Sequence, residues 1–171
     1  IQNSINSGVT FTIAAGNFNM DACGFSPGRA PQAITVGALT ASDAKAGYSN
    51  FGSCVDVWAP GTSVLSASHS NDTDGRWMSG TSMAAPHVAG AWAVLRQAEP
   101  GASVDDIRQA LRETGTSVDD QRSGGTVDDM RRINLVLALD WLINPQPELA
   151  TDPVAGSPLD LGDVAVSAMG A

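Results

Sequence analysis

The sequence has few of the groups that nucleic-acid binding or membrane insertion requires. It holds nine Lys and Arg residues against 18 Asp and Glu, which gives a formal net charge of −9 at pH 7. Binding to a phosphate backbone needs clustered basic side chains, so we expect no DNA or RNA partner. No apolar run approaches the roughly 18 residues of a membrane span, and the first residues, Ile1 to Ser4, lack the basic and apolar regions of a signal peptide. The sequence therefore predicts no membrane partner either.

Cysteine is also scarce, because only Cys23 and Cys54 are present. Two cysteines allow one intramolecular disulfide, and they can equally remain two buried free thiols. The acidic composition, rich in Ser, Gly and Thr, is compatible with a secreted protein, in which disulfides persist. Composition and spacing leave the pairing open.

The length and composition indicate one globular domain followed by a tail. Of the 171 residues, 43% are hydrophobic and 16% are charged, a balance typical of a folded protein with a real core. After Asn144, prolines recur among acidic and small residues, with no Lys or Arg to the end. We therefore predict a domain over residues 1–143 and an acidic, Pro-containing linker or disordered tail over residues 144–171.

Short apolar runs alternate with helical patterns along the domain. Buried strands are predicted over residues 8–15, 33–39 and 55–59. They lack strict alternation, which favours a sheet covered on both faces. Helices are predicted over residues 83–98, 104–114 and 133–142, and residues 1–7 are typical of the last turns of another. This alternation predicts an α/β layer fold.

Two helix starts carry capping signals. Residues 83–98 are apolar nearly all round, which predicts a buried helix that Thr81 or Ser82 caps. Ser103, with Asp106 three residues later, forms a variant of the capping box. The other acidic pairs, Asp119-Asp120 and Asp128-Asp129, are interpreted as helix caps or solvated surface.

Ser82 stands where a predicted strand turns into that apolar helix. Helix N-terminal N–H groups and the helix dipole stabilise negative charge, so a serine nucleophile is favoured there. Gly80 gives the adjacent backbone freedom. From the residues alone, a plain capping serine is the more common explanation. The G-x-S-x-G elbow of α/β-hydrolases is disfavoured, because Ala84 stands where its second glycine belongs.

Two motifs resemble the subtilisin-like (subtilase) serine proteases. Residues 80–90, GTSMAAPHVAG, resemble the nucleophile signature of that family. Upstream, residues 14–17, AAGN, resemble the segment whose asparagine donates to the oxyanion. Further segments that look like the family are FSP at 25–27, TVGA at 35–38, YSNFG at 48–52 and APG at 59–61. The resemblance covers roughly residues 8–139 and is greatest to the proteinase K and aqualysin branch, whose similarly placed cysteines form a disulfide.

The resemblance implies a fold, a reaction and a set of site residues. The fold is an α/β/α three-layer arrangement with a mainly parallel sheet, incomplete at its N-terminal side. Ser82 would attack a peptide carbonyl, with the oxyanion held by its own N–H and by Asn17, which otherwise reads as a turn residue after a strand. The residues expected to contact substrate are Ala14, Ala15, Gly16, Gly80 and Thr81. Polypeptide substrates, secretion and a Cys23–Cys54 disulfide follow from the same resemblance.

A serine needs an adjacent base, and this chain lacks an obvious one. The family places its residues in the order Asp, His, Ser, yet no Asp or His precedes Asn17. His87 lies five positions after Ser82, about 140° around the helix, so we expect a buried, hydrogen-bonded core residue. His69 is expected on a polar surface loop. We therefore expect a C-terminal fragment whose missing N-terminal part is its partner; the alternative is a noncatalytic binding domain.

Metal ligands are not assigned. Relatives often bind structural calcium, and loop aspartates have suitable oxygens. These aspartates are Asp21, Asp43, Asp72 and Asp74. However, Thr40 stands where the proteinase K pattern has a calcium carboxylate, and loop aspartates are commonly solvated turn residues. The prediction is that no cofactor is required and no metal site is assigned.

Overall fold

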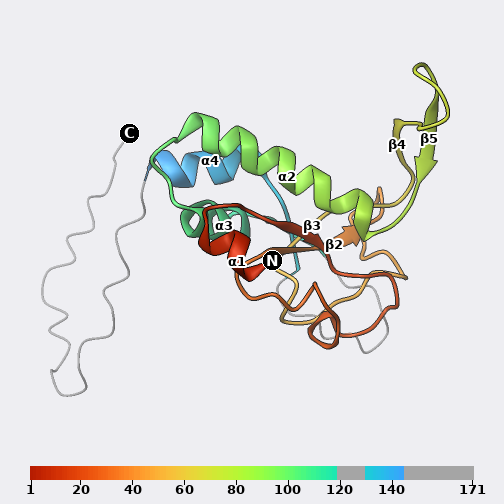
Figure 1. Cartoon of the computed structure of the whole chain (residues 1–171), viewed down its shortest axis with the longest axis horizontal. Helices are drawn as coiled ribbons and strands as arrows, with labels where there is room; N and C mark the ends of the chain where they lie inside the picture. The colour runs from red at the N-terminus through yellow and green to blue at the C-terminus, as the bar shows by residue number, and fades with distance from the viewer. Residues whose placement is uncertain (119–129, 145–171) are drawn as a thin grey trace, which may run out of the picture.

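The computed structural model describes residues 1–118 and 130–144 and places a mainly parallel sheet beneath a long helix (Figure 1). The elements are α1 (Gln2–Asn6), β1 (Thr12–Ala14), a 3-10 turn (Ala22–Gly24), β2 (Ile34–Leu39), β3 (Val57–Pro60), β4 (Val64–Ala67), β5 (Gly75–Met78), α2 (Thr81–Ala98), α3 (Val104–Glu113), β6 (Thr116–Ser117), β7 (Arg131–Arg132) and α4 (Leu135–Ile143). The predicted tail lies outside the described residues except for Asn144, as do Asp119-Asp120 and Asp128-Asp129.

The main sheet has five strands in the order β1-β2-β3-β7-β6. β1, β2, β3 and β7 pair in parallel, and β6 pairs antiparallel with β7. Parallel neighbours need crossover connections and bring their carboxyl ends to one edge of the sheet. Ala14 therefore ends β1 on the same side as Leu39 ends β2, and the loop that carries Asn17 begins there.

Strand β2 is buried on both faces, as predicted. All six residues of β2 are buried, from Ile34 to Leu39. Ile34, Val36 and Ala38 share one core cluster with α2, α3 and α4. Leu39 belongs to a second cluster with Trp58, Val118 and Met130. The α/β class with a mainly parallel sheet is thereby confirmed.

The two capping predictions have different outcomes. Ser103 caps α3 in a complete capping box, since Asp106 N–H donates to the Ser103 hydroxyl oxygen and Ser103 N–H donates to the Asp106 carboxylate. For α2, the cap prediction is wrong. The capping residue is Gly80, which makes no side-chain hydrogen bond, and both Thr81 and Ser82 lie inside the helix.

The predicted burial of α2 is also wrong in part. Its buried residues form one stripe toward the sheet: Thr81, Ala84, Ala85, Val88, Ala91 and Leu95. Pro86, Ala89, Gly90 and Ala93 are exposed on the opposite side. The residues are small and apolar all round, but among the described segments only the sheet and the neighbouring helices cover the helix.

A hairpin of β4 and β5 was not predicted. The two strands pair antiparallel, with Leu65 opposite Trp77, and the hairpin projects away from the body near the start of α2 (Figure 1). Its residues are almost all exposed, so the sequence has neither the buried run nor the strict alternation that reveals a strand. Within the described residues, no helix is both long enough and apolar enough to cross a membrane.

Candidate active site

Ser82 is the second residue of α2 and is exposed. The helix starts abruptly because Gly80 has φ +154°, a backbone conformation that side-chain-bearing residues rarely adopt. Gly80 N–H donates to Gly61 O at 2.8 Å and Gly80 O accepts from Met83 N–H at 3.0 Å, which fixes both sides of the junction. The hydroxyl is thus presented at the N-terminus of an 18-residue helix, where the helix dipole favours negative charge.

Asn17 follows β1 and is anchored at the same junction. Its side-chain oxygen Oδ1 accepts from Thr81 N–H at 2.9 Å and from the Thr81 hydroxyl at 3.0 Å. Since two donors point at this atom, it is the oxygen of the carboxamide, and Nδ2 is the end directed away. Nδ2 stands 3.5 Å from the position that a Cβ on Gly80 would occupy. No described residue accepts a hydrogen bond from Nδ2.

Thr81 connects the two segments that carry the predicted site. Its side chain is fully buried, and its Oγ1 accepts from Gly16 N–H at 3.1 Å while donating to Asn17. The threonine therefore crosslinks the loop after β1 to the first turn of α2. The Ser82 N–H, in the first turn of the helix, and the Asn17 carboxamide N–H₂ are therefore both donors at this junction. Two such donors are the arrangement that stabilises a developing oxyanion.

The residues predicted to contact substrate differ in accessibility. Ala14 and Gly16 are partly exposed at the end of β1. Ala15, Gly80 and Thr81 are buried, so any substrate contact of theirs would use backbone atoms or follow a local opening. The substrate role of all five residues stays a prediction.

A hollow of about 330 Å³ opens beside Ser82 between the start of α2 and the hairpin strand β4. Its lining residues are Val64, Leu65, Ser66, Ser82, Met83, Pro86 and His87. The hollow leaves room next to the Ser82 hydroxyl for a further side chain or for part of a substrate.

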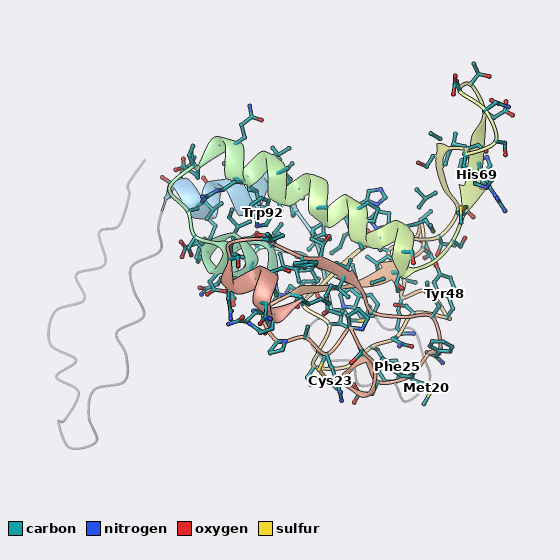
Figure 2. All side chains as sticks on the ribbon, viewed as in Figure 1. Met20, Cys23, Phe25, Tyr48, His69 and Trp92 are labelled. Atoms are coloured by element: carbon teal, nitrogen blue, oxygen red, sulfur yellow. A yellow bond between two sulfur atoms is a disulfide. The ribbon has the colours of Figure 1, made fainter. Side chains whose placement is uncertain are left out.

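Neither histidine is hydrogen-bonded to Ser82. The prediction that His87 is buried is wrong, because the side chain lies on the exposed side of α2; its Nδ1 pairs with Met83 O at 2.8 Å. Since a carbonyl only accepts, Nδ1 carries the proton. His69 is exposed on the projecting hairpin, well away from the body of the molecule (Figure 2).

The predicted disulfide is confirmed. Cys23 and Cys54 are bonded, at a sequence separation of 31 (Figure 2). Asp21 accepts from Cys23 N–H at 2.9 Å through its carboxylate, and Ala22 N–H donates to Phe51 O at 2.7 Å. The bridge thus fastens the segment after Asn17 to the segment that leads into β3.

No cluster of three or more His, Cys, Asp or Glu side chains suited to a metal occurs within residues 1–118 and 130–144. Asp43 forms an ion pair with Arg132 at 3.0 Å. Asp21 and Asp74 bind their own turns, since Asp21 accepts from Cys23 N–H and Asp74 accepts from the Asn71 carboxamide. These loop aspartates therefore have local roles in the described structure.

Residues 1–130 match the Subtilase family of peptidases, and the chain belongs to that family. An extracellular serine proteinase of Thermus sp. (strain Rt41A) is 50% identical over 111 residues, which cover 65% of this chain and 27% of that protein. Alkaline serine exoprotease A of Vibrio alginolyticus is 45% identical over 111 residues, covering 65% of this chain and 20% of that protein. The chain thus spans about a fifth to a quarter of these curated relatives.

Solved structures agree with the fold. A cold-adapted subtilisin-like serine proteinase superposes with a TM-score of 0.69 at 41% identity, covering 78% of this chain and 48% of that one. A protease of Pseudoalteromonas arctica superposes with a TM-score of 0.71 at 33% identity, covering 81% of this chain and 45% of that one. The subtilisin-like fold is confirmed, and the chain spans about half of each solved structure.

Proposed function

We propose that this chain supplies the nucleophile and the oxyanion hole of a secreted serine endopeptidase. The observation that carries the proposal is the pair of hydrogen bonds from Thr81 to Asn17 Oδ1. They turn the Asn17 N–H₂ group outward at the start of α2, next to Ser82, and no described residue accepts a hydrogen bond from it. Donors that are fixed before the reaction stabilise the charge that develops in acyl transfer.

The reaction would pass through an acyl-enzyme. The Ser82 Oγ attacks the peptide carbonyl carbon as a base takes its proton, and the carbonyl oxygen becomes an oxyanion between Ser82 N–H and Asn17 Nδ2. The C–N bond then breaks, and the amine leaves with the proton returned by the base. Water, deprotonated by the same base, attacks the ester and releases the acid, which regenerates the Ser82 hydroxyl. All bonds and protons of this reaction are accounted for by Ser82, the base and water, so its steps need no metal or redox cofactor.

The base and its orienting carboxylate are proposed to come from a part of the protease outside these 171 residues. The coverage of only 48% and 45% of the solved relatives supports this division, with residues 1–143 forming the C-terminal part of the peptidase domain. The hollow beside Ser82 offers the space for the base. The exposed side of α2, with Pro86, Ala89 and Ala93, offers a surface of small residues on which a helix of that part could pack.

Reading the encoding DNA in frame upstream of Ile1 tests this division first. An aspartate motif followed by a histidine motif would support a complete triad. An in-frame stop codon directly before Ile1 would instead favour the second candidate, a noncatalytic subtilase-like binding domain, because the described residues provide Ser82 with no hydrogen-bonded base.

The nucleophile itself is tested by covalent labelling of the full-length protein with a fluorophosphonate. Ser82→Ala should abolish both labelling and peptide hydrolysis, since the attacking oxygen is removed. Ser79→Ala is the matched control, because Ser79 is also exposed and lies three residues earlier, and it should be labelled normally. Normal turnover by Ser82→Ala would refute the proposed function.

A further inference from the structure

The buried side chain of Asn50 is hydrogen-bonded to the backbone of the loop that carries Asn17. Asn50 has no exposed surface. Its Oδ1 accepts from Phe18 N–H at 2.9 Å and from Met20 N–H at 3.1 Å. Its Nδ2 donates to Ala15 O at 2.9 Å, and its backbone N–H donates to Gly16 O at 2.9 Å.

These four hydrogen bonds bracket Asn17 in the sequence. Two reach the residues just before Asn17, and two reach residues after it, while the Asn17 side chain itself bonds only to Thr81 among the described residues. Asn50 therefore holds the backbone of the loop in place on both sides of Asn17, and Thr81 fixes the rotation of the Asn17 carboxamide. Together they leave the carboxamide one orientation.

Gly16 and the Asn50 side chain are tightly packed against each other. Gly16 has φ +105°, and a Cβ built on it would stand 2.5 Å from Asn50 Nδ2. A contact that short does not occur in real structures, so the Asn50 carboxamide occupies the space that any side chain at position 16 would need. The position of the Asn50 side chain thus requires a glycine at position 16.

Lys45 supports the far end of the same loop. Its side chain is 8% exposed, and its ammonium donates to Asn19 Oδ1 at 2.9 Å. Asn19 has φ +52°, and its N–H donates to Tyr48 O at 2.8 Å. The ammonium also lies 5.4 Å from the centre of the Phe51 ring. A buried charge directed at a turn residue stabilises one conformation of that turn.

We propose that Asn50, supported by Lys45, is a positioning residue for the oxyanion hole, acting through Asn17 without touching the substrate. The inference rests on the proposed function, since it needs Asn17 to bind the oxyanion. Its physical basis is that a donor stabilises a transition state only where it is fixed before the charge develops. A displacement of about 1 Å can cost roughly a hundredfold in rate.

The test compares Asn50→Ala with Ser49→Ala in the full-length protease. Ser49 is the matched control, because it is equally buried but faces β2, accepting from Ala38 N–H at 3.0 Å and donating to Asn50 O at 2.9 Å. Asn50→Ala should lower kcat by roughly ten- to a hundredfold with little change in KM. Ser49→Ala should leave kcat within about threefold at a temperature where both variants are folded. Equal effects of the two variants on kcat would overturn the inference.

A double-mutant cycle with Asn17→Ala separates positioning from general destabilisation. If Asn50 acts through Asn17, the double variant should have the kcat of Asn17→Ala alone. Multiplying effects would overturn the positioning role while leaving the proposed function standing. An unchanged kcat in Asn17→Ala would overturn the oxyanion role of Asn17, and the positioning role with it.

If Asn50→Ala does not fold, Lys45→Met decides the matter. This variant keeps the apolar stem but removes the donor to Asn19. A kcat lowered about threefold or more at constant KM, and again non-additive with Asn17→Ala, supports the inference. A wild-type kcat, or a loss that multiplies with that of Asn17→Ala, refutes it.

Discussion

Thr81 Oγ1 donates a hydrogen bond of 3.0 Å to Asn17 Oδ1, and this bond joins two segments that are 64 positions apart in the chain. The same hydroxyl oxygen accepts from Gly16 N–H at 3.1 Å. Because a hydroxyl has one proton, donation to Asn17 and acceptance from Gly16 fix its rotation. The Thr81 side chain thus points inward and orients the Asn17 carboxamide, while the neighbouring Ser82 is exposed.

Replacing Thr81 with Val should lower kcat about tenfold. One hydrogen bond to Asn17 is lost, and about 1.4 kcal/mol of transition-state stabilisation corresponds to a factor of ten. Thr81→Ser keeps the hydroxyl and should stay within about threefold of the wild type. Steady-state kinetics on a peptide substrate check both values, and equal kcat values for the two variants would contradict an orienting role of the hydroxyl.

Asn17→Ala should lower kcat by about 10²–10³ with little change in KM, which is the size of loss known for an oxyanion-hole asparagine in a subtilisin. The donor acts on the charge that forms in the transition state, so substrate binding is spared. Asn71→Ala, on the exposed hairpin turn, is the control and should leave kcat unchanged. A raised KM with normal kcat would mean that Asn17 binds substrate instead.

Breaking the Cys23–Cys54 disulfide should lower the free energy of unfolding by up to about 3–4 kcal/mol. The bridge closes a loop of 31 positions, and loop-closure entropy of the unfolded chain gives that magnitude. Urea unfolding of Cys23→Ser, Cys54→Ser and the double variant measures it. The three should agree, because each removes the same bond; a double variant as stable as the wild type would show that the bridge adds nothing.

Removing the α3 cap should destabilise the protein by about 1 kcal/mol. Ser103→Ala leaves Asp106 N–H without its side-chain acceptor. Ser117→Ala is a suitable comparison, because Ser117 is also exposed and has no capping role in the described structure. Chemical unfolding at neutral pH tests the difference, and equal stability of the two variants would argue against the cap.

The same cap should make stability depend on pH. Hydrogen bonds from the Ser103 side chain and then from its backbone N–H lower the pKa of Asp106 below its ordinary 3.8. The folded state therefore favours the ionised carboxylate, so the contribution is full above pH 3.8 and is lost as the pH falls through the lowered pKa. In Asp106→Asn this acid-dependent part should vanish. Identical pH profiles for variant and wild type between pH 5 and about 2 would exclude it.

Local patterns predicted those elements whose causes are local. The strands over β2 and β3, the α3 helix with its capping box, and the helix after Asn134 all rest on residues a few positions apart. The ends of the elements were predicted less accurately. The strand predicted over residues 8–15 covers only Thr12–Ala14, and the helix predicted over residues 133–142 begins at Leu135. The β4–β5 hairpin escaped prediction because its exposed strands lack a hydrophobic pattern.

The orientation of Asn17 was decided by the tertiary structure alone. The two family motifs identify Asn17 and Ser82, but no pattern shows that the Thr81 hydroxyl turns inward or that Asn50 lies beneath the loop. Asn50 stands in the segment YSNFG, which resembles the family without revealing a role. Asn50 reaches the loop from the connection between β2 and β3, and its Oδ1 accepts from Phe18 N–H.

The sequence by itself determined the family and indicated Asn17 and Ser82 as candidate site residues, because the two motifs depend on residue types at short, fixed spacings. The pairing of Cys23 with Cys54 followed only from the family resemblance. The tertiary structure decided which atoms of those residues face outward, which polar groups are buried under the loop and where the hollow beside Ser82 opens. These features arise from contacts between segments 30 to 65 positions apart, as Asn50 with Met20 and Gly16 with Thr81 illustrate. Such contacts form only once the sheet and α2 have packed, so no local pattern encodes them.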